Sequence, residues 1–184
     1  MRLFLGTAIP LPHATELRER IAPLLATTNW REAPVEQWHV TALFIGDRPD
    51  VALPIIRQAA AHLASSTPPI TLAKGRLVTM PKDVPSMLWI RFQPAPVLTA
   101  LHVALAARTG TEPSIYRPYW PHITLARARK NNVEALDGEV LVDRLTLNEL
   151  TLFHSTLGPN GSVHQPLESW PFTGTDPAAH VAVP

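Results

Sequence analysis

The chain has 184 residues, 46% of them hydrophobic, which is enough to build one domain with a substantial core. Its formal net charge of +1 excludes the strongly basic surface of a non-specific nucleic-acid binder. It has no cysteine, which excludes disulfides, thiolate nucleophiles and cysteine-ligated metal sites and fits a reducing compartment. No stretch approaches the roughly 18 consecutive apolar residues of a membrane span. We therefore expect a cytoplasmic protein with no membrane segment and no targeting signal.

Hydrophobic periodicity predicts alternating strands and helices in the first half of the chain. Pro10 and Pro12 end the first strand, Pro23 is expected to kink or shorten the first helix, and Pro54 suits only the first turn of the second helix. The expected elements are a strand at 2–9, a helix at 13–28, a strand at 35–46 and a helix at 51–66.

A similar order follows in the second half. Gly110 is a typical helix stop, and the GPNG sequence at 158–161 is typical of a turn between strands. The expected elements are strands at 70–80 and 86–92, a helix at 96–110, a strand at 121–127, one long strand at 141–157 and a closing strand at 162–172. Residues 174–184 are expected to form a frayed tail. The repeated order favours an α+β protein made of two similar lobes within one domain, residues 1–184.

The same short motif occurs in both halves, as HVTALFIG from residue 39 and HITLARAR from residue 122. Two further His-x-Thr triplets begin at His13 and His154, so the triplet by itself carries little information. The two motifs differ from those triplets because apolar residues occupy the intervening and following positions within strand-like sequence. Residues i and i+2 of a strand share a face, so each histidine projects beside its threonine, Thr41 or Thr124.

An imidazole beside a hydroxyl, supplied twice, suits acid–base chemistry on a phosphate. Histidine titrates near neutral pH, so one histidine can take a proton from the attacking group while the other donates one to the leaving oxygen. The alternative is structural: two buried histidines with one hydrogen bond each, next to threonines that favour strands. The occurrence of the motif in two matching contexts favours the catalytic interpretation.

The two motifs resemble the paired H-x-T-x motifs of the two-histidine phosphoesterases. Further segments match the LigT-like RNA 2′,3′-cyclic phosphodiesterases, or 2′-5′ RNA ligases, over about residues 2–172. These segments are RLFLGTAIP, WHVTALFIG, the pair GRL and LWIRF with Gly75 and Trp89, YRPYWPHITLAR, and LTLFHSTLGPNG followed by SWPF. The resemblance implies a bilobal fold with two pseudo-symmetric lobes of antiparallel sheet, helices outside and a central cleft.

The resemblance also implies an activity: hydrolysis of 2′,3′-cyclic phosphate ends of RNA to a 2′-phosphate, without metal or cofactor. His39 would be the general acid at the departing 3′ oxygen, and His122 the base that activates water. Thr41, Thr124 and Arg127 would bind the phosphate. RNA ends, including those of tRNA-derived fragments, would be the substrate of a monomeric enzyme with weak, reversible 2′-5′ ligase activity.

Two positions after the motifs are less clear from the sequence. Arg127 is five residues after His122 and would point away from it in a regular strand, so a bulge or the end of the strand must turn it back if it contacts the phosphate. Otherwise it is a solvated arginine at the end of a strand. Phe44 occupies the equivalent position after His39, where it could stack on a base but is expected to pack in the core. Tyr116, Tyr119 and Trp120 raise the same question, with packing favoured.

One departure from the family pattern lies after the glycine turn, where the family commonly has a tyrosine and this chain has SVH. His164 would either line the cleft in place of that tyrosine or lie on the surface. The other histidines are expected to be structural: His13, His62, His102, His154 and His180. Two rival functions remain open, a phosphodiesterase acting on another cyclic phosphate or a 2′-5′ oligonucleotide, and an RNA-end-binding module without turnover.

Overall fold

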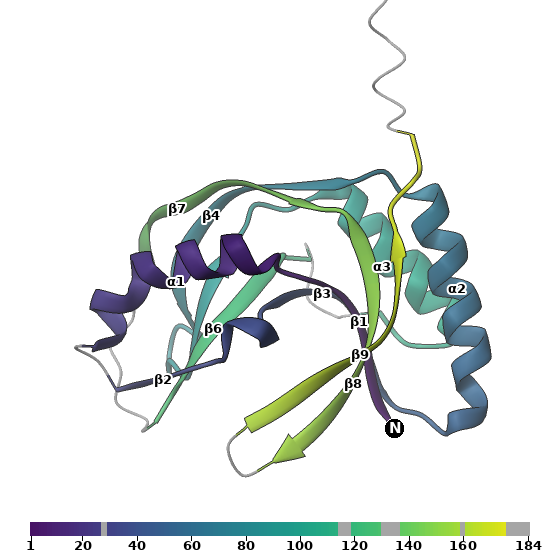
Figure 1. Ribbon diagram of the computed structural model, residues 1–184, viewed down its shortest axis with the longest axis horizontal. Coiled ribbons are helices and arrows are strands. Elements are labelled where there is room, and N and C mark those ends of the chain that lie inside the picture. The colour runs from purple at the N-terminus through teal and green to yellow at the C-terminus, as the bar shows by residue number, and fades with distance from the viewer. Residues whose placement is uncertain (27–28, 114–118, 130–136, 159–160, 176–184) are drawn as a thin grey trace, which may run out of the picture.

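A computed structural model describes residues 1–26, 29–113, 119–129, 137–158 and 161–175. The described residues form three helices and one sheet. Figure 1 shows the helices packed around this extended, strongly curved sheet. The helices are α1 (Leu11–Ala26), α2 (Leu53–Ser66) and α3 (Pro96–Thr109), with short 3-10 turns at Val35–Gln37 and Asp50–Ala52. The strands are β1 (Arg2–Ala8), β2 (Trp30–Glu32), β3 (His39–Asp47), β4 (Ile70–Met80), β5 (Met87–Arg91), β6 (His122–Ala128), β7 (Asp137–Leu147), β8 (Glu149–Gly158) and β9 (Gly161–Pro171).

The sheet consists of two halves joined at the strands that begin with His39 and His122. Its order is β7-β4-β5-β6-β3-β1-β8-β9, with β2 paired to β6, and all of these pairings are antiparallel. Strands β3 and β6 meet through the single residue pair Val40 and Ile123. The two expected lobes are therefore the halves on either side of this junction, and the predicted fold class is confirmed.

The helices divide between the two halves. Helices α2 and α3 pack against each other, α3 also contacts β3, and α2 contacts β8 and β9. Helix α1 lies in the other half (Figure 1). Its Leu17 lines a groove of about 210 Å³ together with Ile123 and Leu145. Ile123 and His122 are successive residues of β6, so their side chains point to opposite faces of the sheet. The α1 side of β6 is therefore the side away from the motif histidine.

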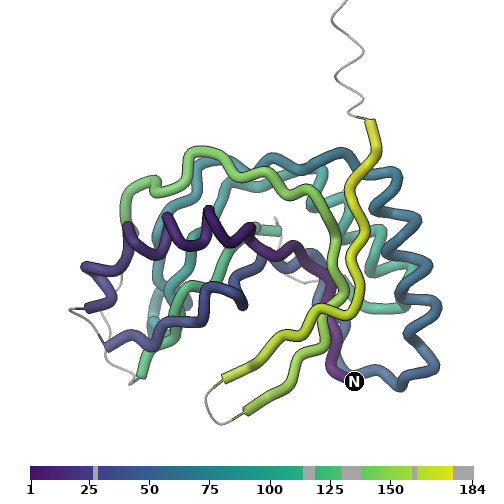
Figure 2. The backbone as a smooth tube through the Cα atoms, in the orientation of Figure 1, coloured from purple at the N-terminus to yellow at the C-terminus, as the bar shows by residue number. Residues whose placement is uncertain are grey.

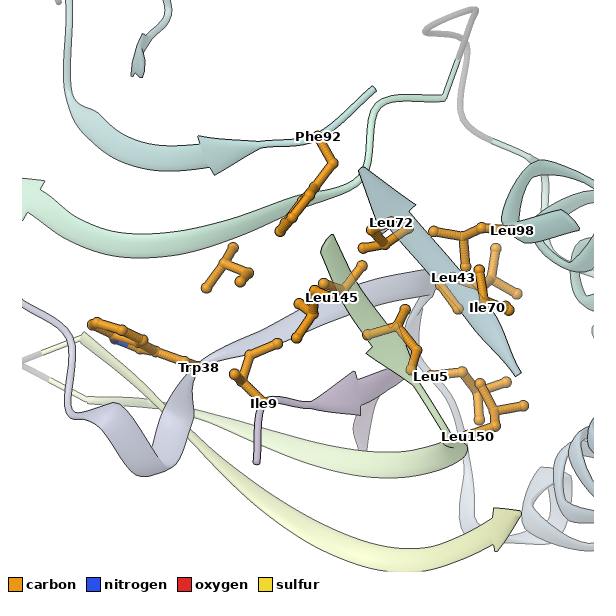
Figure 3. Packing of buried hydrophobic residues seen from close by; sticks show 14 of the residues in the cluster. Leu5, Ile9, Trp38, Leu43, Ile70, Leu72, Phe92, Leu98, Leu145 and Leu150 are labelled. Atoms are coloured by element: carbon orange, nitrogen blue, oxygen red, sulfur yellow. The ribbon is translucent and has the colours of Figure 1, made fainter. Parts of the chain in front are cut away.

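One continuous hydrophobic core connects the two halves. Figure 3 shows Leu5 and Leu43 from β1 and β3 close to Ile70 of β4, and Trp38 at the far end of the cluster. Trp38 is fully buried, and its indole N–H donates to the Ala33 carbonyl at 2.9 Å. The residue immediately before the first motif histidine is thus anchored in the core, which fixes the start of β3.

Several element boundaries differ from the sequence expectations. The expected strand at 141–157 is two strands, because Asn148 separates β7 from β8 and the chain passes there from one half of the sheet to the other (Figure 2). Strand β2 was not expected, since three residues are too few for a periodic pattern. Helix α1 begins at Leu11 and continues past Pro23.

The expected tail is only partly described. Gly174 lies against the end of α2, where its N–H donates to the Thr67 carbonyl at 3.0 Å. A Cβ at Gly174 would lie 2.4 Å from the Ser66 backbone, so this contact requires glycine. Residues 176–184 lie outside the described residues.

Candidate active site

A cavity of about 330 Å³ opens on the face of the sheet that carries the two motifs. It is lined by every residue that the sequence nominated for catalysis or substrate binding: His39, Thr41, Phe44, His122, Thr124 and Arg127. Arg2, Phe4, Arg31, Gln37, Trp89 and His164 also line it. Residues from both halves of the sheet therefore meet in a single cavity.

The junction between β3 and β6 explains why the motifs meet. Directly opposed residues of antiparallel strands project to the same face. Counting outward from the pair Val40 and Ile123 sets His39 opposite Thr124, and Thr41 opposite His122. Val40 and Ile123 are buried on the opposite face, whereas the histidines and threonines are half-buried beside the cavity. The two motifs thus form one four-residue cluster with approximate twofold symmetry.

A bulge in β6 turns Arg127 back toward the cavity. Leu88 pairs with Ala126 but its neighbour Trp89 pairs with Thr124, so Leu125 is an extra residue on β6. Leu125 and Ala126 are consequently both buried, and the alternation is inverted from there to Arg127. Of the two features that could turn Arg127 back toward the face of His122, a bulge or the end of the strand, the structure has the bulge.

Strand β3 carries an equivalent bulge. Leu5 pairs with Leu43 and Gly6 with Thr41, which leaves Ala42 as the extra residue. Phe44 is turned to the cavity side by this inversion, and its side chain is 48% exposed. The core-packing alternative for Phe44 is therefore wrong, although Arg2 covers its ring with a guanidinium carbon 4.7 Å from the centroid.

Two side chains hydrogen-bond to the carbonyl groups at the β3 bulge. The hydroxyl of Tyr119 donates to the Thr41 carbonyl, and Nδ1 of His102 donates to the Ala42 carbonyl at 2.7 Å. The rings of His102 and Tyr119 are stacked with centroids 4.6 Å apart. Burial raises the pKa of Tyr119 to about 12, so its hydroxyl remains a donor. Both residues have the structural role that the sequence favoured.

Each motif histidine is held by a carbonyl group two residues earlier in the chain. Nδ1 of His39 lies 2.7 Å from the Gln37 oxygen, and Nδ1 of His122 lies 3.0 Å from the Trp120 oxygen. A carbonyl oxygen only accepts, so Nδ1 carries the proton in both rings. In each neutral ring Nε2 is then the nitrogen left to exchange a proton.

Burial shifts both histidines toward the neutral form. It lowers the pKa of His39 to about 4, with smaller contributions from the charges of His164 and His122, while the Gln37 hydrogen bond opposes the shift. Burial also lowers the pKa of His122, against the opposing hydrogen bond to Trp120. Two neutral imidazoles with unprotonated Nε2 atoms are able to accept a proton, and an anion beside them favours the protonated form.

His164 lines the cavity rather than lying on the surface. Its ring is edge-on to His39, with centroids 5.0 Å apart, and lies 4.9 Å from Phe4. The side-chain amide of Gln37 accepts from the His164 N–H at 2.5 Å and donates to its carbonyl oxygen at 3.3 Å. Gln37 therefore holds both His39, through its own carbonyl, and the backbone of His164. Burial and the nearby Arg127 lower the pKa of His164.

The sequence did not indicate several residues of the cavity. Trp89 was noted only as part of a family segment, yet it stacks on His122 from β5. Gln37 and Arg31 lie in the 3-10 turn and the short strand before β3, where no periodic pattern marks them. Alternation around the buried Trp30 is the one signal that could have assigned Arg31 to the opposite face.

The remaining expected residues lie elsewhere. His13 lines the groove under α1, His62 is exposed on α2, and His154 is half-buried in β8. Trp120 is exposed beside the Arg91 guanidinium. Tyr116 and His180 lie outside the described residues. Within the described ranges, no helix is long and apolar enough to cross a membrane, and no three His, Asp or Glu side chains form a group suited to a metal ion.

Known proteins are similar to this chain in both sequence and fold. A family model described as the 2′-5′ RNA ligase superfamily matches residues 9–157. A Thermus thermophilus protein named RNA 2′,3′-cyclic phosphodiesterase is 28% identical over 184 residues, which cover 95% of this chain and 91% of that protein.

Solved structures show the same architecture. The Thermus thermophilus protein TT0787 superposes with a TM-score of 0.83 at 25% identity, covering 96% of this chain and all of that one. E. coli LigT complexed with 3′-AMP has a TM-score of 0.73 at 21% identity, covering 94% and 98%. Since the family model spans most of the chain, including both motif strands, this protein belongs to the 2′-5′ RNA ligase superfamily.

Proposed function

We propose that this protein hydrolyses the 2′,3′-cyclic phosphate end of an RNA to a 2′-phosphate, with His39 and His122 as the acid–base pair. The observation that carries the proposal is the pair of imidazoles in one cavity, each with Nδ1 bound to a backbone carbonyl and with Nε2 left for proton exchange. The 28% identical relative is named for this activity, and its similarity extends over nearly the whole chain.

The proposed step needs only groups of this chain and one water molecule. Nε2 of His122 takes a proton from the water as its oxygen forms a bond to phosphorus. The bond from phosphorus to the 3′ oxygen breaks, and Nε2 of His39 donates a proton to that oxygen. The product has a free 3′-hydroxyl and a 2′-phosphate. One proton enters one histidine and one leaves the other, so a later proton exchange with solvent restores the starting state.

The assignment of His39 as the general acid follows the family resemblance. A general acid must carry a proton that it can donate, so His39 must be protonated when the substrate is bound. A pKa of about 4 leaves His39 neutral at pH 7. The negative charge of a bound phosphate opposes this shift and favours the imidazolium. We therefore propose that His39 takes up its proton when the substrate binds.

Three polar residues around the histidines are proposed to bind the non-bridging oxygens. The hydroxyls of Thr41 and Thr124 lie on the histidine face of their strands, and the Arg127 guanidinium follows them along β6. Hydrogen bonds from a charged donor to phosphate are short and strong. Phe44, exposed in the same cavity, is proposed to stack on the terminal base.

The same site would support ligation if the 5′-hydroxyl of a second RNA replaced water. Its oxygen would form the bond to phosphorus, His122 would take its proton, and the 3′ oxygen would leave as before, giving a 2′-5′ linkage. Water is present at far higher concentration, so hydrolysis is the main reaction. We further propose that the enzyme acts as a monomer, since one chain supplies both histidines, on RNA ends such as tRNA-derived fragments in the cytoplasm.

The proposal is tested with an RNA oligonucleotide that ends in a 2′,3′-cyclic phosphate, in buffer containing EDTA. Wild type should yield a 2′-phosphate, and His39→Ala and His122→Ala should each lose at least about a hundredfold in kcat. His62→Ala is the matched control, because His62 lies outside the cavity on α2. Binding without opening of the ring would favour an RNA-end-binding module. If the enzyme opened another cyclic phosphate faster, or cleaved a 2′-5′ oligonucleotide faster, that compound would replace the RNA end as the proposed substrate.

A further inference from the structure

Arg31 and Arg127 form a pair of like charges at one side of the cavity. Strand β2 pairs with the end of β6, and the register sets Arg31 directly opposite Arg127. Both side chains line the cavity that holds the two motif histidines. Directly opposed residues in an antiparallel pair are only about 5 Å apart at Cα, so the two guanidiniums share one region.

This arrangement of two like charges is electrostatically unfavourable by itself. Like charges directly opposite each other destabilise a strand pair. In the part of the chain that the structure describes, neither guanidinium has a carboxylate partner or a hydrogen bond. The adjacent carboxylate, Glu32, accepts instead from Arg18, at 2.7 and 3.3 Å. An anion bound between Arg31 and Arg127 would compensate both charges.

Neighbouring contacts fix the backbone of β2 on both sides of Arg31. Trp30 is buried on the opposite face of β2, and Glu32 forms an ion pair with Arg18. The Arg31 side chain extends to the start of β9, where Nη2 lies 3.5 Å from the position of a Cβ on Gly161. Arg31 therefore lies beside Arg127 on a paired strand, with its guanidinium directed toward β9.

A cyclic phosphate carries a single negative charge, whereas the cavity supplies this pair of guanidiniums in addition to Arg2, which covers Phe44. With Arg127 proposed to bind the cyclic phosphate, we propose that Arg31 beside it forms a second anion subsite for the phosphodiester on the 5′ side of the terminal nucleotide. The inference rests on the proposed function and adds a substrate preference to it. The enzyme should favour oligonucleotide ends over a nucleoside 2′,3′-cyclic phosphate, which lacks that second phosphate.

The test compares three substrates. These are adenosine 2′,3′-cyclic phosphate, a diadenosine substrate with the same cyclic end and one internal phosphodiester, and the same dinucleotide with an uncharged methylphosphonate linkage. Wild type should have at least about tenfold higher kcat/KM on the charged dinucleotide than on the other two. Arg31→Ala should remove this preference without changing kcat/KM on the mononucleotide. In Arg31→Ala, the slope of log kcat/KM against log salt concentration on the charged dinucleotide should be smaller in magnitude than in wild type by about 0.7. This is the value for one phosphate contact on a single strand.

Arg144→Ala is the matched control, since it removes one positive charge from the groove under α1 on the opposite face of the sheet. It should leave the preference unchanged, and Arg31→Lys should restore part of it. Equal loss on all three substrates, or no loss on any, would overturn the second subsite.

A binding measurement separates this proposal from the proposed catalysis. The dinucleotide that ends in a 2′-phosphate should bind wild type at least about tenfold more tightly than adenosine 2′-phosphate, and Arg31→Ala should abolish the difference. This result is expected even if wild type opened none of the cyclic phosphates, an outcome that would refute the proposed function alone. Equal affinities of wild type for the two products would refute the subsite.

Discussion

The indole of Trp89 lies face to face with the imidazole of His122, with ring centroids 3.8 Å apart and an interplanar angle of 17°. His39 has no equivalent among the described residues, because Phe4 meets its ring at a tilt of 34° and His164 meets it edge-on. The two histidines thus share their hydrogen-bond pattern but differ in their ring contacts. An aromatic face stabilises a cation, so Trp89 favours the imidazolium that His122 becomes when it acts as a base.

Replacement of Trp89 should therefore change the chemical step. We expect Trp89→Leu, which keeps an apolar cover over His122 but removes the aromatic face, to lower kcat about tenfold, equivalent to about 1.4 kcal/mol, and to lower the pKa of His122 further. Trp89→Phe keeps an aromatic face and should retain kcat within about threefold. The checks are the pH–rate profile and an NMR titration of the His122 ring. An unchanged His122 titration in Trp89→Leu would show that the stack has no electrostatic role.

The charge of His164 should influence His39. Burial is the main cause of the low pKa of His39, and the neighbouring His164 lowers it further. We expect His164→Gln to raise the pKa of His39, and we expect adenosine 2′-phosphate to raise it in wild type. NMR titration of the imidazole resonances measures both effects, with His62→Gln as the control. A pKa of His39 that is insensitive to the bound product would argue against its proposed role as acid.

The neutral histidines should make stability depend on pH. The pKa of His39 is about 4 in the folded chain and 6.5 as the reference for an unfolded one, so the unfolded chain binds more protons between these values. The shifts of His122 and His164 have the same direction. The contribution of these groups is fully present above about pH 6.5 and is lost as pH falls toward 4. The urea midpoint of unfolding should therefore decrease as pH is lowered from 7.5 to 4.5. The decrease should be less steep in His39→Gln than in wild type. A midpoint independent of pH in this range would contradict the burial of neutral imidazoles.

The bulge in β3 should depend on the two side chains that bind its carbonyl groups. Tyr119→Phe leaves the Thr41 carbonyl without its donor and should cost about 1–3 kcal/mol in the free energy of unfolding. His102→Ala removes the bond to Ala42 and should cost at least as much. The rings are stacked, so the double variant should be non-additive.

Because both variants lie outside the cavity, any loss of activity reports on strand geometry. We expect KM to rise through misplacement of Phe44, with a smaller change in kcat. Denaturant unfolding and steady-state kinetics on the same preparations provide the test. Additive losses of stability would indicate that the two side chains support the bulge independently.

Local sequence patterns were sufficient to nominate the paired side chains at the centre of the candidate site. A strand has a side-chain period of two, so each His-x-Thr segment by itself sets an imidazole beside a hydroxyl. The need for an irregularity before Arg127 also followed from parity alone, because an offset of five residues reverses the direction of a side chain in a regular strand, but only the structure showed that this irregularity is a bulge. The helices and most strands were visible for the same reason, as periodic apolar runs.

Only the tertiary structure decided which residues surround these motifs. The meeting of β3 and β6 depends on one pair between strands 83 positions apart, and no local pattern encodes a non-local register. Phe44 reaches the cavity because the β3 bulge inverts its direction, and the break at Asn148 marks where the chain passes between the halves of the sheet. Arg31, Trp89, Gln37 and His164 come from four separate segments. Their role around the histidines follows from packing, which no single segment of the sequence specifies.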